Sequence, residues 1–153
     1  MDQTSDADER FMRLALDEAR RCVAHGDVPV GAAVVRGGEV LAVAGNAREL
    51  ERDPTAHAEI VALRAAARSL RSWHLEGCAL YVTLEPCAMC AGAAVLARLD
   101  RVVFGADDPK AGFAGSLGNV LQEERLNHRT ELTSGVLADD CSEVLRAFFR
   151  DRR

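Results

Sequence analysis

The chain has 153 residues, of which 48% are hydrophobic and 28% are charged. This composition is typical of a globular protein and excludes disorder throughout the chain. The formal net charge of −5 argues mildly against a nucleic-acid binder, whose usual mark is an excess of positive charge. No apolar run approaches the roughly 20 residues of a membrane-spanning helix, and the polar residues 1–10 contain no secretory apolar region. We therefore expect a cytoplasmic protein with no membrane partner.

The N-terminal part of the chain predicts a leader followed by a helix. Residues 1–7 are polar and acidic, and we expect them to form a flexible leader. From residue 8 to residue 25 apolar side chains recur at helical spacing, until Gly26 and Pro29 interrupt the pattern. Because no linker composition and no internal repeat follows, residues 8–153 are expected to form a single domain.

The remaining elements alternate between short strands and helices. Two β-branched runs flank the dipeptide Gly37-Gly38, which is a strong hairpin signal. Residues 46–55 are predicted to be a polar loop, and residues 105–119 a longer loop rich in Gly, Asp and Ala. We expect strands at residues 30–35, 40–44, 79–84, 101–104 and 131–133, and helices at residues 56–70, 87–97 and 139–150. This order of elements favours helices packed around one mixed sheet.

Two short clusters of residues carry the chemistry. The first is Thr55–Glu59, with His57 and Glu59, and the second is Glu85–Cys90, with Pro86, Cys87 and Cys90. Together they form His-x-Glu followed by Pro-Cys-x-x-Cys, which is the signature of the zinc nucleoside deaminases. Thiolate sulfur and imidazole nitrogen both bind zinc readily, and two cysteines three positions apart lie on one face of a helix. Three protein ligands leave a fourth position for water, as in a catalytic zinc site.

Glu59 follows His57 by two positions, which on a regular helix turns the two side chains to roughly opposite faces. Since both side chains cannot easily bind one ion in the same way, we expect Glu59 to contact the zinc-bound water instead. Zinc lowers the pKa of that water to near neutrality. Glu59 is then expected to accept its proton and deliver it to the ring nitrogen and the departing amine, a transfer that contributes about 100- to 10,000-fold.

Simpler interpretations of the cysteines compete with this one. A structural zinc site would leave Glu59 as a surface residue and would need a fourth ligand. A thioredoxin-like redox pair would use neither His57 nor Glu59. The candidates for a fourth ligand are Cys78, His74 and His25. The cysteines outside the motif are expected to be buried as small hydrophobic residues, namely Cys22, Cys78 and Cys141.

Further segments extend the pattern over nearly the whole chain. They are Val28–Gly31, Asp53–Ile60, Leu80–Cys87, Met89–Ala93, Arg101–Ala106, Gly115–Ser116, Asn127–Arg129 and Phe148–Arg150. With these segments the chain resembles the bacterial tRNA-specific adenosine deaminases, which convert the wobble adenosine of a tRNA anticodon to inosine. The zinc motifs alone indicate only the wider deaminase superfamily. The loop after residue 104 and the C-terminal Phe-Phe-Arg segment are what point to the tRNA enzymes.

The resemblance implies a cytidine-deaminase-like α/β fold, a three-layer α/β/α sandwich around a five-stranded mixed sheet. It also implies a homodimer that binds a tRNA anticodon stem-loop. One Zn²⁺ ion per subunit is implied, with His57, Cys87 and Cys90 as ligands and Glu59 as the proton shuttle in hydrolytic deamination by zinc-bound hydroxide. The alternative is a zinc deaminase of a free nucleobase or nucleotide, of the cytosine or guanine type, because it shares all four of these residues. A zinc-stabilised binding module without chemistry is a third hypothesis.

RNA contacts are expected outside the zinc motifs. Asn46 matches the family residue that contacts the flipped base, and Asp108 is expected to accept a hydrogen bond from a ribose 2′-OH. Lys110, the only lysine in the chain, is available to contact a phosphate. Aromatic and arginine side chains near the C-terminus suit RNA loops, although either Phe148 or Phe149 is expected in the core. The predicted substrate and RNA contacts are Asn46, Ala58, Asp108, Lys110, Phe149, Arg150, Arg152 and Arg153. Without the resemblance, Asn46 and Asp108 are interpreted as ordinary turn residues.

Overall fold

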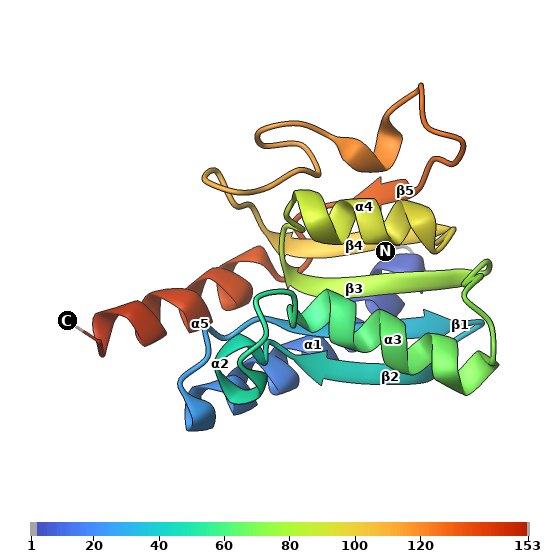
Figure 1. The fold of residues 1–153 in the computed structure, drawn as a ribbon. Helices are drawn as coiled ribbons and strands as arrows, with labels where there is room; N and C mark the ends of the chain where they lie inside the picture. Colours follow the sequence, from blue (N-terminus) through green and yellow to red (C-terminus); the bar gives the residue numbers. More distant parts are fainter. Residues whose placement is uncertain (1–2, 153) are drawn as a thin grey trace.

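A five-stranded mixed sheet forms the centre of the computed structural model, which describes the backbone of residues 3–152 and the side chains of residues 6–152. The strand order is β2-β1-β3-β4-β5 (Figure 1). The first three strands pair antiparallel, whereas β3, β4 and β5 run parallel. The strands are β1 (Gly31–Arg36), β2 (Glu39–Gly45), β3 (Cys78–Leu84), β4 (Arg101–Ala106) and β5 (Glu131–Thr133).

Helices cover both faces of this sheet. On one face lie α3 (Ala58–Leu70) and α4 (Ala88–Leu96), and on the other lie α1 (Gln3–Arg21) and α5 (Ala138–Arg150) (Figure 1). The shorter helical segments are η1 (Cys22–His25), α2 (Arg48–Glu51) and η2 (Val120–Gln122). This arrangement confirms the predicted three-layer α/β/α sandwich. Among the described residues, no helix combines the length and the apolar character that crossing a membrane requires.

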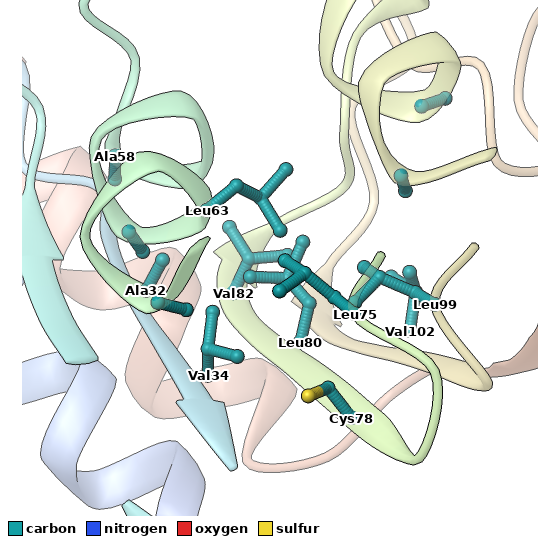
Figure 2. Packing of buried hydrophobic residues seen from close by; sticks show 14 of the residues in the cluster. Ala32, Val34, Ala58, Leu63, Leu75, Cys78, Leu80, Val82, Leu99 and Val102 are labelled. Carbon is teal, nitrogen blue, oxygen red and sulfur yellow. The ribbon is translucent and has the colours of Figure 1, made fainter. Parts of the chain in front are cut away.

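The alternation of side chains along the strands divides the core into two clusters. On β1, Ala32 and Val34 face α3 and α4, while Ala33 and Val35 face α1. Figure 2 shows the first cluster, in which Leu63 of α3 lies over the β3 side chains. Because both faces are covered, the central strands are buried on successive residues, as a sheet between two helical layers requires.

The first helix begins five residues earlier than predicted. It starts at Gln3 and so takes in residues 3–7 of the expected flexible leader, whereas residues 1–2 lie outside the described residues. Tertiary contacts hold this part of the helix, where Ala7 packs against the apolar cluster under α1 and Asp8 forms buried hydrogen bonds. Its buried carboxylate accepts hydrogen bonds from the Tyr81 hydroxyl at 2.7 Å and from the Arg101 guanidinium at 2.8 Å. These bonds hold the start of the helix against β3 and β4.

The segment predicted as a polar loop after β2 contains the short helix α2. The buried carboxylate of Asp27 accepts hydrogen bonds from the backbone N–H groups of Glu49 at 2.7 Å and Leu50 at 3.1 Å. This caps the start of α2 from a distant part of the chain, which local sequence patterns do not reveal. The other predicted strands and the helices after the hairpin agree with the structure to within two residues. The hairpin turn at Gly37-Gly38, with both φ angles positive, also agrees.

Candidate active site

His57 and the two motif cysteines meet where the N-terminal ends of α3 and α4 converge. His57 occupies the N-cap position of α3 and Cys87 that of α4. Cys90 lies in the first turn of α4. The Nδ1 atom of His57 lies 3.6 Å from Sγ of Cys87 and 3.5 Å from Sγ of Cys90. The three candidate ligand atoms all lie within 4.8 Å of one another. The structure therefore brings the three predicted ligands together in a group that can hold a metal ion.

The separations in this group suit a tetrahedral zinc site. Zinc–sulfur and zinc–nitrogen bonds of the usual lengths place such ligands about 3.5 Å apart at the tetrahedral angle.

The candidates for a fourth ligand lie elsewhere. Cys78 begins β3, at the opposite end of that strand from the site, and the exposed His74 stacks on Trp73. His25 pairs with Asp27 through a 2.6 Å contact. Three ligands beside a pocket are typical of a catalytic zinc site.

Glu59 faces the same pocket as His57. It is the second residue of α3, and its side chain is buried close to the Cys90 thiol. Burial raises the pKa of the Glu59 carboxyl. The two-residue spacing is compatible with a shared pocket because His57 has extended backbone angles, φ −67° and ψ 152°, and so stands before the helix. The opposite-face rule for a regular helix does not apply to this pair.

The two thiols differ in their electrostatics. A hydrogen bond with Cys90 is the largest cause that lowers the pKa of Cys87 to about 3, and His57 lowers it further. The same thiol–thiol contact raises the pKa of Cys90, together with burial and the nearby Glu59. The pKa of His57 is raised chiefly by its hydrogen bond with Cys87. A divalent cation among these groups favours the thiolate form of both cysteines.

A pocket of about 200 Å³ opens beside the group. It lies between the start of α3, the end of β3, the α2 segment and the loop after β4. The lining residues are Val28, Val30, Asn46, Arg48, His57, Ala58, Glu59, Leu84, Glu85, Cys87, Asp108 and Ala111. Three of the predicted substrate contacts, Asn46, Ala58 and Asp108, are therefore placed at the pocket.

Asn46 and Asp108 also hold the backbone around them. The Asn46 amide donates to the carbonyl of Val28 at 3.1 Å and accepts from the backbone N–H of Arg48 at 3.3 Å. The Asp108 carboxylate accepts from the backbone N–H groups of Lys110 at 3.1 Å and Ala111 at 3.2 Å. Both residues thus play the local turn role as well as lining the pocket. Lys110 itself is exposed and lies outside the pocket wall.

The predicted C-terminal contacts lie away from the pocket. Phe149 is 51% exposed, whereas Phe148 is buried, so the structure decides which phenylalanine belongs to the core. The Arg152 guanidinium lies over the Phe148 ring, 3.9 Å from its centroid, and Arg150 pairs with Glu143 at 3.3 Å. The remaining predicted contact, Arg153, lies outside the described residues.

Two charged residues of the pocket have no role assigned from the sequence, although one of them, Glu85, begins the second motif cluster. Arg48 stands at the pocket on α2, a helix that was itself missed, and nothing in its local pattern distinguishes it from other exposed arginines. Glu85 lies between the end of β3 and Pro86, and a carboxylate next to the metal motif is the signal that would have singled it out. Burial opposes ionisation of Glu85, but hydrogen bonds from Ser116 and from neighbouring backbone groups outweigh it and lower the pKa.

Comparison with known proteins agrees with this geometry. Residues 6–153 match the family model of the MafB19-like deaminases. The "tRNA-specific adenosine deaminase" of Bacillus subtilis is 53% identical, over 95% of this chain and 91% of that protein. The chain belongs to the tRNA-specific adenosine deaminase family. The resemblance inferred from the sequence motifs is therefore confirmed.

Solved structures of deaminases share the fold. One, from a study of A-to-I editing by tRNA:A34 deaminases at the wobble position of transfer RNA, is 42% identical. Its TM-score is 0.86, with 89% of this deaminase and 99% of that chain covered. A guanine deaminase from Nitrosomonas europaea is 26% identical, with a TM-score of 0.80 over 92% of this deaminase and 83% of that chain. The same architecture thus accommodates both a polymeric and a free-base substrate class.

Proposed function

We propose that this protein hydrolyses the 6-amino group of the wobble adenosine in a tRNA anticodon, producing inosine and ammonia. The observation that carries the proposal is the group of His57, Cys87 and Cys90 beside Glu59 at one pocket, in a chain 53% identical to a tRNA-specific adenosine deaminase. We assign the reaction to a single deaminase domain over residues 8–153, with a cytoplasmic location, where tRNA is available.

Zinc is the metal that these side chains suit, because two thiolates and an imidazole at the observed separations match its preferred ligands and geometry. We infer one ion per subunit. Bound there, zinc supplies an acidified water as a nucleophile near neutral pH. His57, Cys87 and Cys90 would hold the ion from the ends of two helices, beside the pocket that would take the base.

Glu59 handles the protons of the reaction. Its carboxylate accepts one proton from the attacking water as the new C6–O bond forms and delivers it to the ring nitrogen N1. It then takes the second proton of that water from the C6 hydroxyl and delivers it to the amino group, so that the C6–N bond breaks, the C6 carbonyl forms and ammonia leaves. Burial beside the pocket keeps this carboxyl directed at the reacting atoms and away from bulk water.

The pocket and its rim contact the substrate. The Asn46 amide uses one N–H and one lone pair on Val28 and Arg48, which leaves a second of each for the edge of the flipped base. Ala58 forms the floor beside His57, and Asp108 accepts a hydrogen bond from a ribose 2′-OH. We assign Lys110, Phe149, Arg150, Arg152 and Arg153 to the anticodon stem-loop outside the pocket.

A homodimer is part of the proposal. An apolar groove of about 300 Å³ runs between α3 and α4, and it is flanked by the exposed side chains of Trp73 and Leu96. A second copy of the chain would cover these apolar side chains. Sedimentation at micromolar concentration should give twice the 16.5 kDa chain mass, and Leu96→Glu should shift the protein towards monomer. A monomer in the unmodified protein contradicts the proposal.

The alternative substrate is a free nucleobase. The guanine deaminase shares the fold at 26% identity, well below the 42% and 53% of the tRNA-directed proteins. The deciding experiment incubates zinc-loaded protein with an anticodon stem-loop carrying a wobble adenosine and, in parallel, with free guanine, cytosine and adenosine. Inosine in the stem-loop alone supports the proposal. Turnover of a free base alone would keep the zinc chemistry and overturn the substrate.

A further inference from the structure

Glu85 is a buried carboxylate next to the site that the reaction does not use. It follows β3 and stands two positions before Cys87. Its two oxygens accept four hydrogen bonds, all from the loop between β4 and β5. The backbone N–H groups of Asp108, Ala114 and Ser116 donate at 2.9, 3.0 and 3.0 Å, and the Ser116 hydroxyl donates the fourth. Both carboxylate oxygens therefore face the loop, and each accepts two of these hydrogen bonds.

The loop is shaped around this carboxylate. A side chain at Gly112 would overlap the Glu85 carboxylate, so the loop passes it at a distance that only glycine allows. The backbone N–H of Phe113 donates to the carbonyl of Pro86 at 2.8 Å, and Gly112 forms a β-bridge with Cys87. The loop is thereby tied to the segment that carries the metal motif.

The loop forms one wall of the pocket. Asp108 and Ala111 line the pocket, and the backbone N–H of Asp108 is itself one of the four donors to Glu85. The Asp108 carboxylate in turn fixes the backbone of Ala111 through a 3.2 Å hydrogen bond. Glu85 therefore holds this wall through its own four hydrogen bonds, beside the backbone contacts that Gly112 and Phe113 make with Cys87 and Pro86.

We propose that Glu85 is a positioning residue for the RNA substrate, which holds residues 108–116 against the metal motif so that Asp108 and Ala111 meet the extruded nucleotide. This inference rests on the proposed function for its substrate. It separates two tasks at the site. The metal ligands and Glu59 perform the chemistry, and Glu85 sets the wall against which the nucleotide is bound.

Glu85→Gln tests the separation, because the amide replaces an acceptor by a donor that faces the N–H groups of the loop. We expect the KM for the anticodon stem-loop to rise at least tenfold, with kcat changed less than threefold and zinc content unchanged. Hydrogen exchange at the amides of Asp108, Ala114 and Ser116 should accelerate at least tenfold. Glu124→Gln, which removes an exposed carboxylate, is the matched control. It should change neither the KM nor the rate of hydrogen exchange at these amides.

Two further variants keep the test decisive if Glu85→Gln does not fold. Ser116→Ala removes a single hydrogen bond and should raise KM about threefold. Gly112→Ala displaces the loop while Glu85 is retained, and it should reproduce the large rise in KM. Loss of zinc with an unchanged KM would show that Glu85 supports the metal group, and it would overturn the inference. Accelerated exchange with an unchanged KM would overturn it as well.

The exchange measurement does not depend on turnover. If the unmodified protein does not deaminate the stem-loop, the proposed function fails. Hydrogen exchange at the loop amides still measures whether Glu85 holds the loop in place. If the unmodified protein is active and all three variants keep its KM, the proposed function stands and the inference about Glu85 fails.

Discussion

The Sγ atom of Cys87 lies 3.6 Å from Nδ1 of His57, although the two residues are thirty positions apart. Each is the residue that caps a helix, and both have extended backbone angles before the first turn. The side chains of two helix starts therefore converge, and both helix N-termini direct their partial positive charge towards the same point. Such a location favours thiolates, and it stabilises a bound anion or a negatively charged transition state.

Removal of a ligand should remove the metal. Cys87→Ser and Cys90→Ser are each expected to lower bound zinc from about one ion per chain to a small fraction of that, because two protein ligands hold zinc poorly. Cys141→Ser, a buried cysteine on α5, is the matched control and should retain the ion. Metal analysis after gel filtration measures the content. Chelation of the unmodified protein should also lower its melting temperature, since a ligand bound to the folded state stabilises it.

Glu59→Gln should separate the proton shuttle from the metal site. The amide has nearly the same shape but cannot carry a proton between water and base, so we expect turnover of the stem-loop to fall by about 100- to 10,000-fold. Zinc content and melting temperature should stay close to those of the unmodified protein. A Glu59→Gln variant within tenfold of full activity would show that another group moves the protons.

Arg48 should contribute to RNA binding from the rim of the pocket. It is exposed, it lines the pocket, and it is suited to contact a phosphate near the extruded nucleotide. We expect Arg48→Ala to raise the KM for the stem-loop several-fold and to reduce the slope of log affinity against log salt by about one. Arg52 lies at the end of the same short helix and outside the pocket wall. Arg52→Ala should therefore change the KM and the salt slope less than Arg48→Ala does. Equal effects of the two substitutions would show that each arginine acts only through its charge, and that Arg48 makes no specific contact with the RNA.

Asp27 should make stability depend on pH through the cap of α2. Burial alone would raise the pKa of this carboxyl, but the N–H groups of Glu49 and Leu50 and the side chain of His25 outweigh it, so the pKa lies below its ordinary value. The carboxylate therefore stabilises the folded state above the unfolded-state pKa, about pH 4, and this contribution disappears as the pH falls through the lower folded-state value. Urea unfolding at several pH values should show Asp27→Asn less stable than the unmodified protein near pH 6.

An exposed aspartate provides the control for this pH-dependent unfolding experiment. Asp17 pairs with Arg20 at 3.4 Å on the exposed face of α1, so Asp17→Asn should cost little at any pH. The difference in unfolding free energy between the unmodified protein and Asp27→Asn should shrink as the pH is lowered towards 3. A difference that grows on acidification would have the wrong sign and would exclude this role for the carboxylate.

Local sequence patterns predicted those features that depend only on neighbouring residues. The dipeptide Gly37-Gly38 predicted its hairpin because both residues adopt positive φ angles in the turn. The spacing of the Cys87 and Cys90 thiols predicted a shared face at a helix start, since that geometry depends only on the helical repeat. The alternation of strands and helices was sufficient for the mixed sheet between two helical layers, because each element must bury its apolar face.

Contacts between distant segments decided the rest. The start of α1 depends on Asp8 meeting Tyr81 and Arg101, and α2 depends on a carboxylate from another loop. Phe148 is buried beside Arg20 and Val23, whereas its neighbour Phe149 is exposed, and periodicity at the end of a chain does not specify this difference. Sequence alone therefore determined the family, the fold class and the candidate ligands. Only the tertiary structure decided which charged side chains surround the pocket, because hydrogen bonds between residues far apart in the chain place Arg48 and Glu85 there.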